Sequence, residues 1–124
     1  MPPRQALLIV EDDPDLRRLF RTALALSGFD VREAADGLDA LKRIDEGRPD
    51  AVVLDLMMPR VDGFAVLDDL VAQTHTRHIP VIVVTASAAE VSSINVACVL
   101  RKPVQPDALI HAVRGCLLSG AAGA

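Results

Sequence analysis

The chain has 124 residues, of which 51% are hydrophobic and 24% are charged, and its formal net charge is −4. This length fits one domain with a core of its own, and the apolar fraction is too high for a disordered chain. The 13 basic residues are outnumbered by 17 acidic ones, so no basic excess exists for contacts with a phosphate backbone. We therefore expect no direct binding of nucleic acid.

The apolar stretches fall short of the roughly 18 residues that a membrane-spanning helix needs, so we expect no membrane insertion. The first residues show no pattern typical of a signal peptide. Two cysteines, Cys98 and Cys116, do not make a disulfide framework, which favours a reducing compartment. We expect a single cytoplasmic domain over residues 1–124, with a core from about 6 to 118 and a flexible tail at 119–124.

Short apolar runs alternate along the chain with segments of helical periodicity. The runs predict strands at residues 6–10, 29–34, 51–54, 80–84 and 96–100. Helices are predicted where hydrophobic residues recur at three- or four-residue spacing, after Asp13, after Asp36, from Phe64 and from Pro106. Residues 87–95, between the last two strands, leave room for one or two helical turns.

Four of the five predicted strands are apolar throughout, which is typical of strands covered on both faces, whereas residues 29–34 (FDVREA) make a weaker strand. Five strands, alternating with helices in a chain of this length, predict an open, doubly wound α/β fold with a parallel sheet.

Polar residues stand where the predicted strands end: Glu11, Asp12, Asp13, Asp55, Thr85 and Lys102. Ligands of open α/β sheets bind outside the carboxyl ends of the strands, so these side chains should share one site. Converging carboxylates suit Mg²⁺, which prefers oxygen ligands, and a carboxylate can attack a phosphoryl group. A lysine and a threonine can bind phosphoryl oxygens, so the set predicts phosphoryl transfer. Asp13, which precedes a proline, is expected only to cap a helix.

With these residues the chain resembles the response-regulator receiver domains of two-component signalling. The resemblance covers about residues 7–118 and rests on segments 9–13 (IVEDD), 53–63 (VLDLMMPRVDG), 83–86 (VVTA) and 102–103 (KP). It implies a flavodoxin-like, doubly wound five-stranded parallel sheet of order 2-1-3-4-5. It also implies a phosphoprotein with protein–protein output rather than an enzyme.

The resemblance implies that Asp55 is the phospho-acceptor, supplied by a sensor histidine kinase or a phosphotransfer protein. Thr85 and Lys102 would contact the phosphoryl group, and the Lys102–Pro103 peptide would be cis.

The resemblance also implies a Mg²⁺ cofactor. Asp12 and Asp55 would ligate the ion through their carboxylates, and Met57 would ligate it through its backbone carbonyl. Glu11 would lie in the outer shell and hold a metal-bound water.

Two features depart from the family pattern. Val99 stands where receivers usually carry an aromatic residue that turns inward on activation, and the chain has no tyrosine. The distance from Thr85 to Lys102 is 17 residues, shorter than usual, so the fourth helix of the family is expected to be shortened. These departures concern the output surface.

Other readings remain beside the signalling switch. One is a phosphorylation-independent protein-interaction module on a receiver fold. Another, an aspartyl phosphatase, needs a second aspartate two residues after the nucleophile, and Met57 stands there. Arg17, Arg18 and Arg21 form a basic patch on the first helix, either as a solvated face or as the surface that docks a phosphodonor.

Overall fold

The computed structural model describes residues 4–58, 63–86 and 96–123. Its elements are, in chain order, β1 (Ala6–Val10), α1 (Pro14–Leu26), β2 (Asp30–Ala34), α2 (Gly37–Glu46), β3 (Ala51–Asp55), α3 (Gly63–Ala72), β4 (Val81–Thr85), β5 (Cys98–Arg101) and α4 (Pro106–Gly123). The five strands form one sheet of order β2-β1-β3-β4-β5 with parallel pairing throughout. This order confirms the predicted flavodoxin-like fold.

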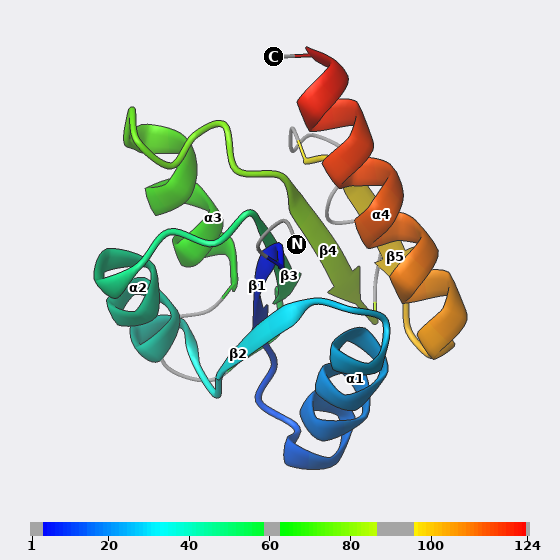
Figure 1. The fold of residues 1–124 in the computed structure, drawn as a ribbon. Helices are drawn as coiled ribbons and strands as arrows, with labels where there is room; N and C mark the ends of the chain where they lie inside the picture. The colour runs from blue at the N-terminus through cyan, green and yellow to red at the C-terminus, as the bar shows by residue number, and fades with distance from the viewer. Residues whose placement is uncertain (1–3, 59–62, 87–95, 124) are drawn as a thin grey trace.

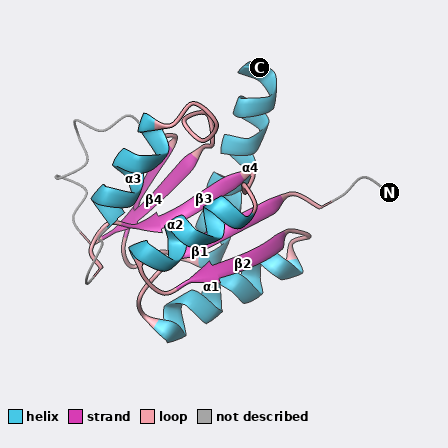
Figure 2. Ribbon diagram, turned by 90° about the vertical axis from the view of Figure 1, so that its left-hand side faces the viewer, coloured by secondary structure: helices cyan, strands magenta, loops and turns pink. Residues whose placement is uncertain are grey.

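The sheet lies between two layers of helices, with α1 and α4 on one face and α2 and α3 on the other (Figures 1 and 2). Each face has its own core. Phe20, Leu24, Leu109 and Val113 pack with one set of strand side chains beneath α1 and α4. A second cluster, which includes Ile44, gathers beneath α2 and α3. Cover on both faces explains why the central strands β1, β3 and β4 are apolar up to their last residue, whereas the edge strand β2 carries charged residues.

Local sequence signals fix where the first two helices begin and where α1 ends. The Asp13 carboxylate accepts hydrogen bonds from the backbone N–H groups of residues 15 and 16, so this residue caps α1 as predicted. The Asp36 carboxylate accepts from the backbone N–H of Asp39 and caps α2 in the same way. After α1 the chain reverses through Gly28 at φ 101°, a conformation that L side chains rarely adopt.

The register of the central strands sets the geometry of the carboxyl edge. Val10 of β1 is paired with Leu54 of β3, and Asp55 is paired with Val84 of β4. The polar residues after β1 and at the end of β4 are therefore brought to the end of β3. The predicted convergence of the strand-end residues rests on this register.

Several element boundaries differ from the sequence predictions. β2 begins at residue 30 rather than 29, β3 and β4 each end one residue later, and β5 runs from residue 98 to 101. Helix α4 continues to Gly123, into the residues that the sequence predicts as a tail; extending an existing helix costs far less than starting one. The shortened helix expected at residues 87–95 lies outside the described residues.

The helix faces also differ in part from the sequence pattern. Leu38 of α2 and Val71 of α3 belong to the helical periodicities, yet they are 61% and 54% exposed. Ala40 and Ile44 make the buried line of α2 instead. Among the helices that the structure describes, none is both long and apolar enough to cross a membrane.

Candidate functional site

Three carboxylates meet at the carboxyl edge of the sheet, after β1 and at the end of β3. Glu11, Asp12 and Asp55 each offer an oxygen, and these oxygens lie within 4.8 Å of one another. Among the described residues, no other group of three or more acids, histidines and cysteines comes together in this way. Glu11 is 2% exposed and Asp55 is 3% exposed, whereas Asp12 is exposed. Two of the three carboxylates are therefore buried, and the third is open to solvent.

Backbone and side-chain contacts fix Glu11 at the start of the turn after β1. Its backbone N–H donates to the carbonyl of Ala34 on β2, at 3.1 Å. The backbone N–H of Asp13 donates to Glu11 Oε2 at 3.2 Å, and Arg17 Nη1 donates to the Glu11 carbonyl at 2.9 Å. The buried carboxylate therefore has little freedom to move away from Asp55.

The two oxygens of Asp55 have different partners. The backbone N–H of Met57 donates to Oδ1 at 3.0 Å. Lys102 Nζ donates to Oδ2 at 3.3 Å, across 47 residues of sequence. The carboxylate is thus held by a neighbour in its own loop and by a cation from the end of β5.

Lys102 joins the two buried acids. Its Nζ lies 2.8 Å from Glu11 Oε1 and 3.3 Å from Asp55 Oδ2. The Lys102 backbone N–H donates to the carbonyl of Thr85 at 2.8 Å, which ties the lysine to the end of β4. The Lys102–Pro103 peptide is cis, as the family resemblance implied. Thr85 is fully buried.

Burial dominates the electrostatics of this cluster. It raises the pKa of Glu11 from 4.5 to about 7, because desolvation disfavours the charged form more than the contact with Lys102 favours it. Burial by itself lowers the pKa of Lys102. The contacts of the lysine with Glu11 and Asp55 outweigh this effect, so the pKa of Lys102 lies above its usual value. Removal of either partner would therefore change the protonation of the other.

The residues present fit a divalent cation. All three acids offer oxygen ligands, the kind that Mg²⁺ prefers. Oε1 of Glu11 is buried and accepts no hydrogen bond of good geometry, although the lysine ammonium lies close to it. Such an oxygen can accept a hydrogen bond from a water molecule held by the ion, the role that the resemblance implied for this residue.

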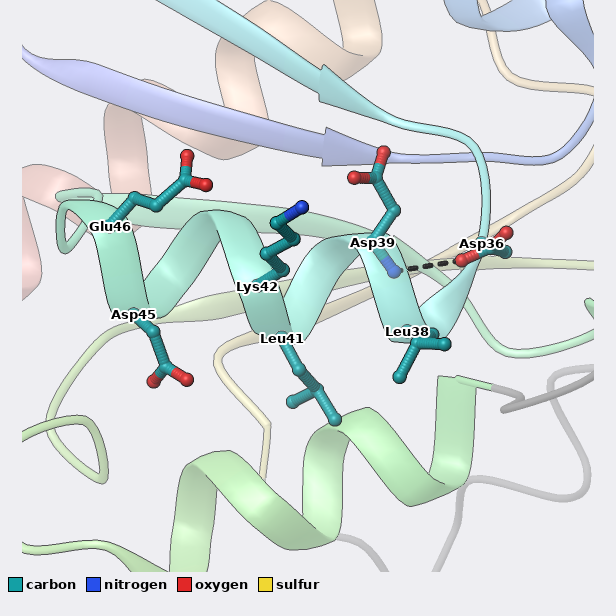
Figure 3. Close-up of a pocket in the computed structure, with 7 residues that line it drawn as sticks. All are labelled: Asp36, Leu38, Asp39, Leu41, Lys42, Asp45 and Glu46. Atoms are coloured by element: carbon teal, nitrogen blue, oxygen red, sulfur yellow. Dashed lines mark hydrogen bonds between the residues drawn. The ribbon is translucent and has the colours of Figure 1, made fainter.

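A separate groove of about 700 Å³ runs along α2 (Figure 3). Leu38 and Leu41 extend toward the side of α3, while Lys42 extends the other way. None of the acids of the site lines this groove, so the groove and the chemistry of the strand ends are separate features.

The histidines and cysteines of the described residues take no part in the acidic cluster. His75, His78 and His111 are exposed and belong to no ligand cluster among the described residues. Cys98 and Cys116 are partly buried against the core, as small hydrophobic residues.

Two residues near the site were missed or misjudged from the sequence. The sequence pattern places Arg17 in a basic surface patch, but its side chain is 20% exposed and its Nη1 donates to the Glu11 carbonyl. Gly63 was not singled out beyond its motif, yet an added Cβ would overlap the Asp55 carbonyl oxygen and Leu56 Cα. Its place in segment 53–63 was the signal that could have found it.

An open 2-1-3-4-5 sheet with three acids and a lysine at its carboxyl edge defines a receiver-type α/β domain. The family described as the response regulator receiver domain matches residues 7–114. The chain therefore belongs to the receiver domains of two-component response regulators, as its motifs indicated.

Similar proteins agree with this assignment. Response regulator MprA of Mycobacterium sp. (strain KMS) is 44% identical over 86 residues, which are 69% of this chain and 36% of that protein. The chain spans about a third of the length of the curated relatives it matches.

Solved structures agree as well. A sensor protein from Polaromonas sp. JS666 superposes with a TM-score of 0.87 at 30% identity, covering 95% of this chain and 99% of the other. The signal receiver domain of a histidine kinase from Syntrophus aciditrophicus superposes with a TM-score of 0.85 at 28% identity, covering 93% and 91%.

Proposed function

We propose that this chain is a phosphorylation-dependent signalling switch in which Asp55 accepts a phosphoryl group. The donor would be the phosphohistidine of a sensor histidine kinase or a phosphotransfer protein. A carboxylate oxygen of Asp55 attacks phosphorus, the P–N bond breaks, and the electron pair leaves with the imidazole. The observation that carries this proposal is the Asp55 carboxylate itself, 3% exposed, at the end of the central strand with Lys102 Nζ 3.3 Å from Oδ2.

The chain's own residues supply most of what the transfer needs. Lys102 holds a positive charge beside Asp55, where it can balance phosphoryl oxygens. Thr85, at the end of β4, would donate a hydrogen bond from its hydroxyl to one of these oxygens. Preorganised charge of this kind lowers the barrier to phosphoryl transfer because no large rearrangement is needed at the moment of reaction.

For the metal ligands we propose the set that the family resemblance implies. Asp12, Asp55 and the Met57 backbone carbonyl would hold Mg²⁺, and Glu11 would act through a bound water. When bound, the ion would neutralise the carboxylates and the phosphoryl oxygens, and so allow an anionic nucleophile to approach an anionic group.

A second candidate is an interaction module that works without phosphorylation. Val99 is half-buried and packs against the core cluster beneath α2 and α3. A β-branched side chain is stiff at χ1 and cannot swing as an aromatic ring does. A valine at this position favours a signal output that does not depend on an inward-turning aromatic ring. The acids and the lysine of the site nevertheless favour the phosphorylation-dependent switch.

Labelling with acetyl phosphate and Mg²⁺, followed by intact-mass measurement, separates these candidates. Wild type and Asp13→Asn should gain one phosphoryl group, because asparagine is as good a helix cap as aspartate. Asp55→Asn should gain none, and excess chelator should prevent labelling of the wild type. An adduct on Asp55→Asn would overturn the assignment, and an unlabelled wild type would favour the interaction module.

A further inference from the structure

Arg17 contacts both ends of the acidic turn, defined here as residues 11–13. Its side-chain Nη1 donates to the Glu11 carbonyl at 2.9 Å. Its backbone N–H donates to the Asp13 carbonyl at 2.9 Å, which is the first hydrogen bond of helix α1 and would form with any residue except proline. Asp12, one of the two carboxylates expected to hold the metal, lies between these two anchor points. The conformation of the turn therefore depends on a residue that is itself no ligand.

Glu33 on β2 holds Arg17 in place. Arg17 Nε lies 3.4 Å from Glu33 Oε1, and Glu33 is paired with Ile9 of β1 in the sheet register. Arg21, one helical turn further along α1, lies 3.4 Å from the other oxygen of the same carboxylate. No hydrogen bond or ion pair joins Arg21 to the acidic turn in the described structure, and its side chain is 54% exposed against 20% for Arg17.

We propose that Arg17 is a positioning residue for the metal site: it fixes the acidic turn so that Glu11 and Asp12 stay beside Asp55. The inference rests on the proposed function, because it assigns Arg17 to the Mg²⁺ site of that function. Lys102 pairs with Glu11 and Asp55, but among the described residues no ion pair joins a cation to Asp12, so this carboxylate is repelled from the other two when no metal is bound. A charged donor on the Glu11 carbonyl opposes that spreading through the backbone.

The direction in which Mg²⁺ affinity changes on removal of Arg17 separates a positioning role from a purely electrostatic one. As a positive charge alone, Arg17 would repel Mg²⁺, and its removal would tighten metal binding. As a positioning residue, its removal loosens the ligands and weakens metal binding. Partners that orient ligands in this way are typically worth about 10-fold to 100-fold in metal affinity.

The test compares Arg17→Met with Arg21→Met, since both variants remove one arginine that pairs with Glu33. The dissociation constant for Mg²⁺ alone is measured by calorimetry in the absence of a phosphodonor. Arg17→Met should bind Mg²⁺ about 10-fold more weakly or worse, and Arg21→Met should bind like the wild type. Equal or tighter binding by Arg17→Met would overturn the inference, as would equal weakening in both variants.

A third variant separates charge from geometry. Arg17→Lys keeps the positive charge, but its single nitrogen cannot reach both the Glu11 carbonyl and Glu33 as the guanidinium does. We expect it to bind Mg²⁺ more weakly than the wild type, and wild-type affinity would overturn the positioning role. Should Arg17→Met not fold, as judged by circular dichroism, this variant decides the question.

Labelling of Asp55 at saturating Mg²⁺ distinguishes the possible failures. A wild type that is labelled and binds Mg²⁺, with Arg17→Met identical to Arg21→Met, would overturn the role of Arg17 alone. A wild type that binds no Mg²⁺ would overturn the metal site of the proposed function and the inference together. Recovery of labelling in Arg17→Met at high Mg²⁺ would show that its defect lies in metal binding.

Discussion

The ammonium nitrogen of Lys102 lies 2.8 Å from Oε1 of Glu11, a carboxylate that is only 2% exposed. The two residues are 91 positions apart in the sequence and meet where β1 and β5 end on the same edge of the sheet. Burial raises the pKa of Glu11 to about 7, and the lysine opposes that rise without cancelling it. Stability and protonation are therefore coupled at this pair.

Stability of the metal-free protein should fall as the pH rises from 4.5 to 7. The folded state raises the pKa of Glu11 from 4.5 to about 7, so over this window it keeps a proton that the unfolded state has lost. One such proton gives a slope of up to about 1.4 kcal/mol per pH unit in the free energy of unfolding. Urea denaturation at several pH values should show this slope in the wild type and a smaller one in Glu11→Gln.

Glu46→Gln, at the exposed end of α2, is the matched control, because it removes one negative charge far from the site. It should keep the slope of the wild type. Identical slopes in the wild type and Glu11→Gln would contradict the raised pKa of Glu11.

Lys102→Met should destabilise the protein by about 2 kcal/mol at pH 8, the usual contribution of a hydrogen bond to a charged group. At pH 8 Glu11 is mostly ionised, and loss of the lysine leaves two buried carboxylates without their cation. The loss should be smaller at pH 5.5, where Glu11 holds a proton. Denaturant titrations at both pH values measure the difference, with the exposed Lys42→Met as control. A loss that is equal at the two pH values would argue against this coupling.

Mg²⁺ should stabilise the fold, because the ion relieves repulsion that exists only in the folded state. At ten times its dissociation constant a ligand adds about 1.4 kcal/mol, which is a rise in melting temperature of roughly 4–8 °C for a domain of this size. Asp12→Ala should abolish the rise and should melt higher than the wild type when both are metal-free. Asp15→Ala, exposed in the first turn of α1, should keep the rise. A wild type that does not respond to Mg²⁺ would count against a metal site.

Gly63→Ala should destabilise the protein by about 2 kcal/mol or more, within the usual range for overpacking. The new Cβ would overlap the Asp55 carbonyl oxygen and Leu56 Cα, and so push α3 away from strand β3, which carries Asp55. Gly115→Ala is the matched control in α4, since a Cβ there meets nothing within 4 Å. It should stabilise by roughly 0.5–1 kcal/mol, because alanine favours a helix interior over glycine. Thermal unfolding of both variants tests the contrast, and equal effects would refute it.

The sequence by itself determined the element order, the parallel α/β class and the convergence of acids at the strand ends. These inferences depend on local chemistry: apolar runs predict covered strands, and Asp13 and Asp36 can cap helices wherever the chain goes afterwards. The order of the sheet came from the resemblance in segments 9–13 and 53–63, since no local signal says which strands are neighbours.

The tertiary structure alone decided how deeply the site is buried and how its charges pair. Nothing near Glu11 in the sequence separates it from its exposed neighbour Asp12. The pairing of β1, β3, β4 and β5 in one sheet places the first beside Lys102 and leaves the second open to solvent. Arg17 gives a similar case, because Glu33 is 16 residues away in sequence but lies beside it once β2 pairs with β1. Burial and charge pairing depend on which segments the folded chain brings together, and local sequence patterns do not contain that information.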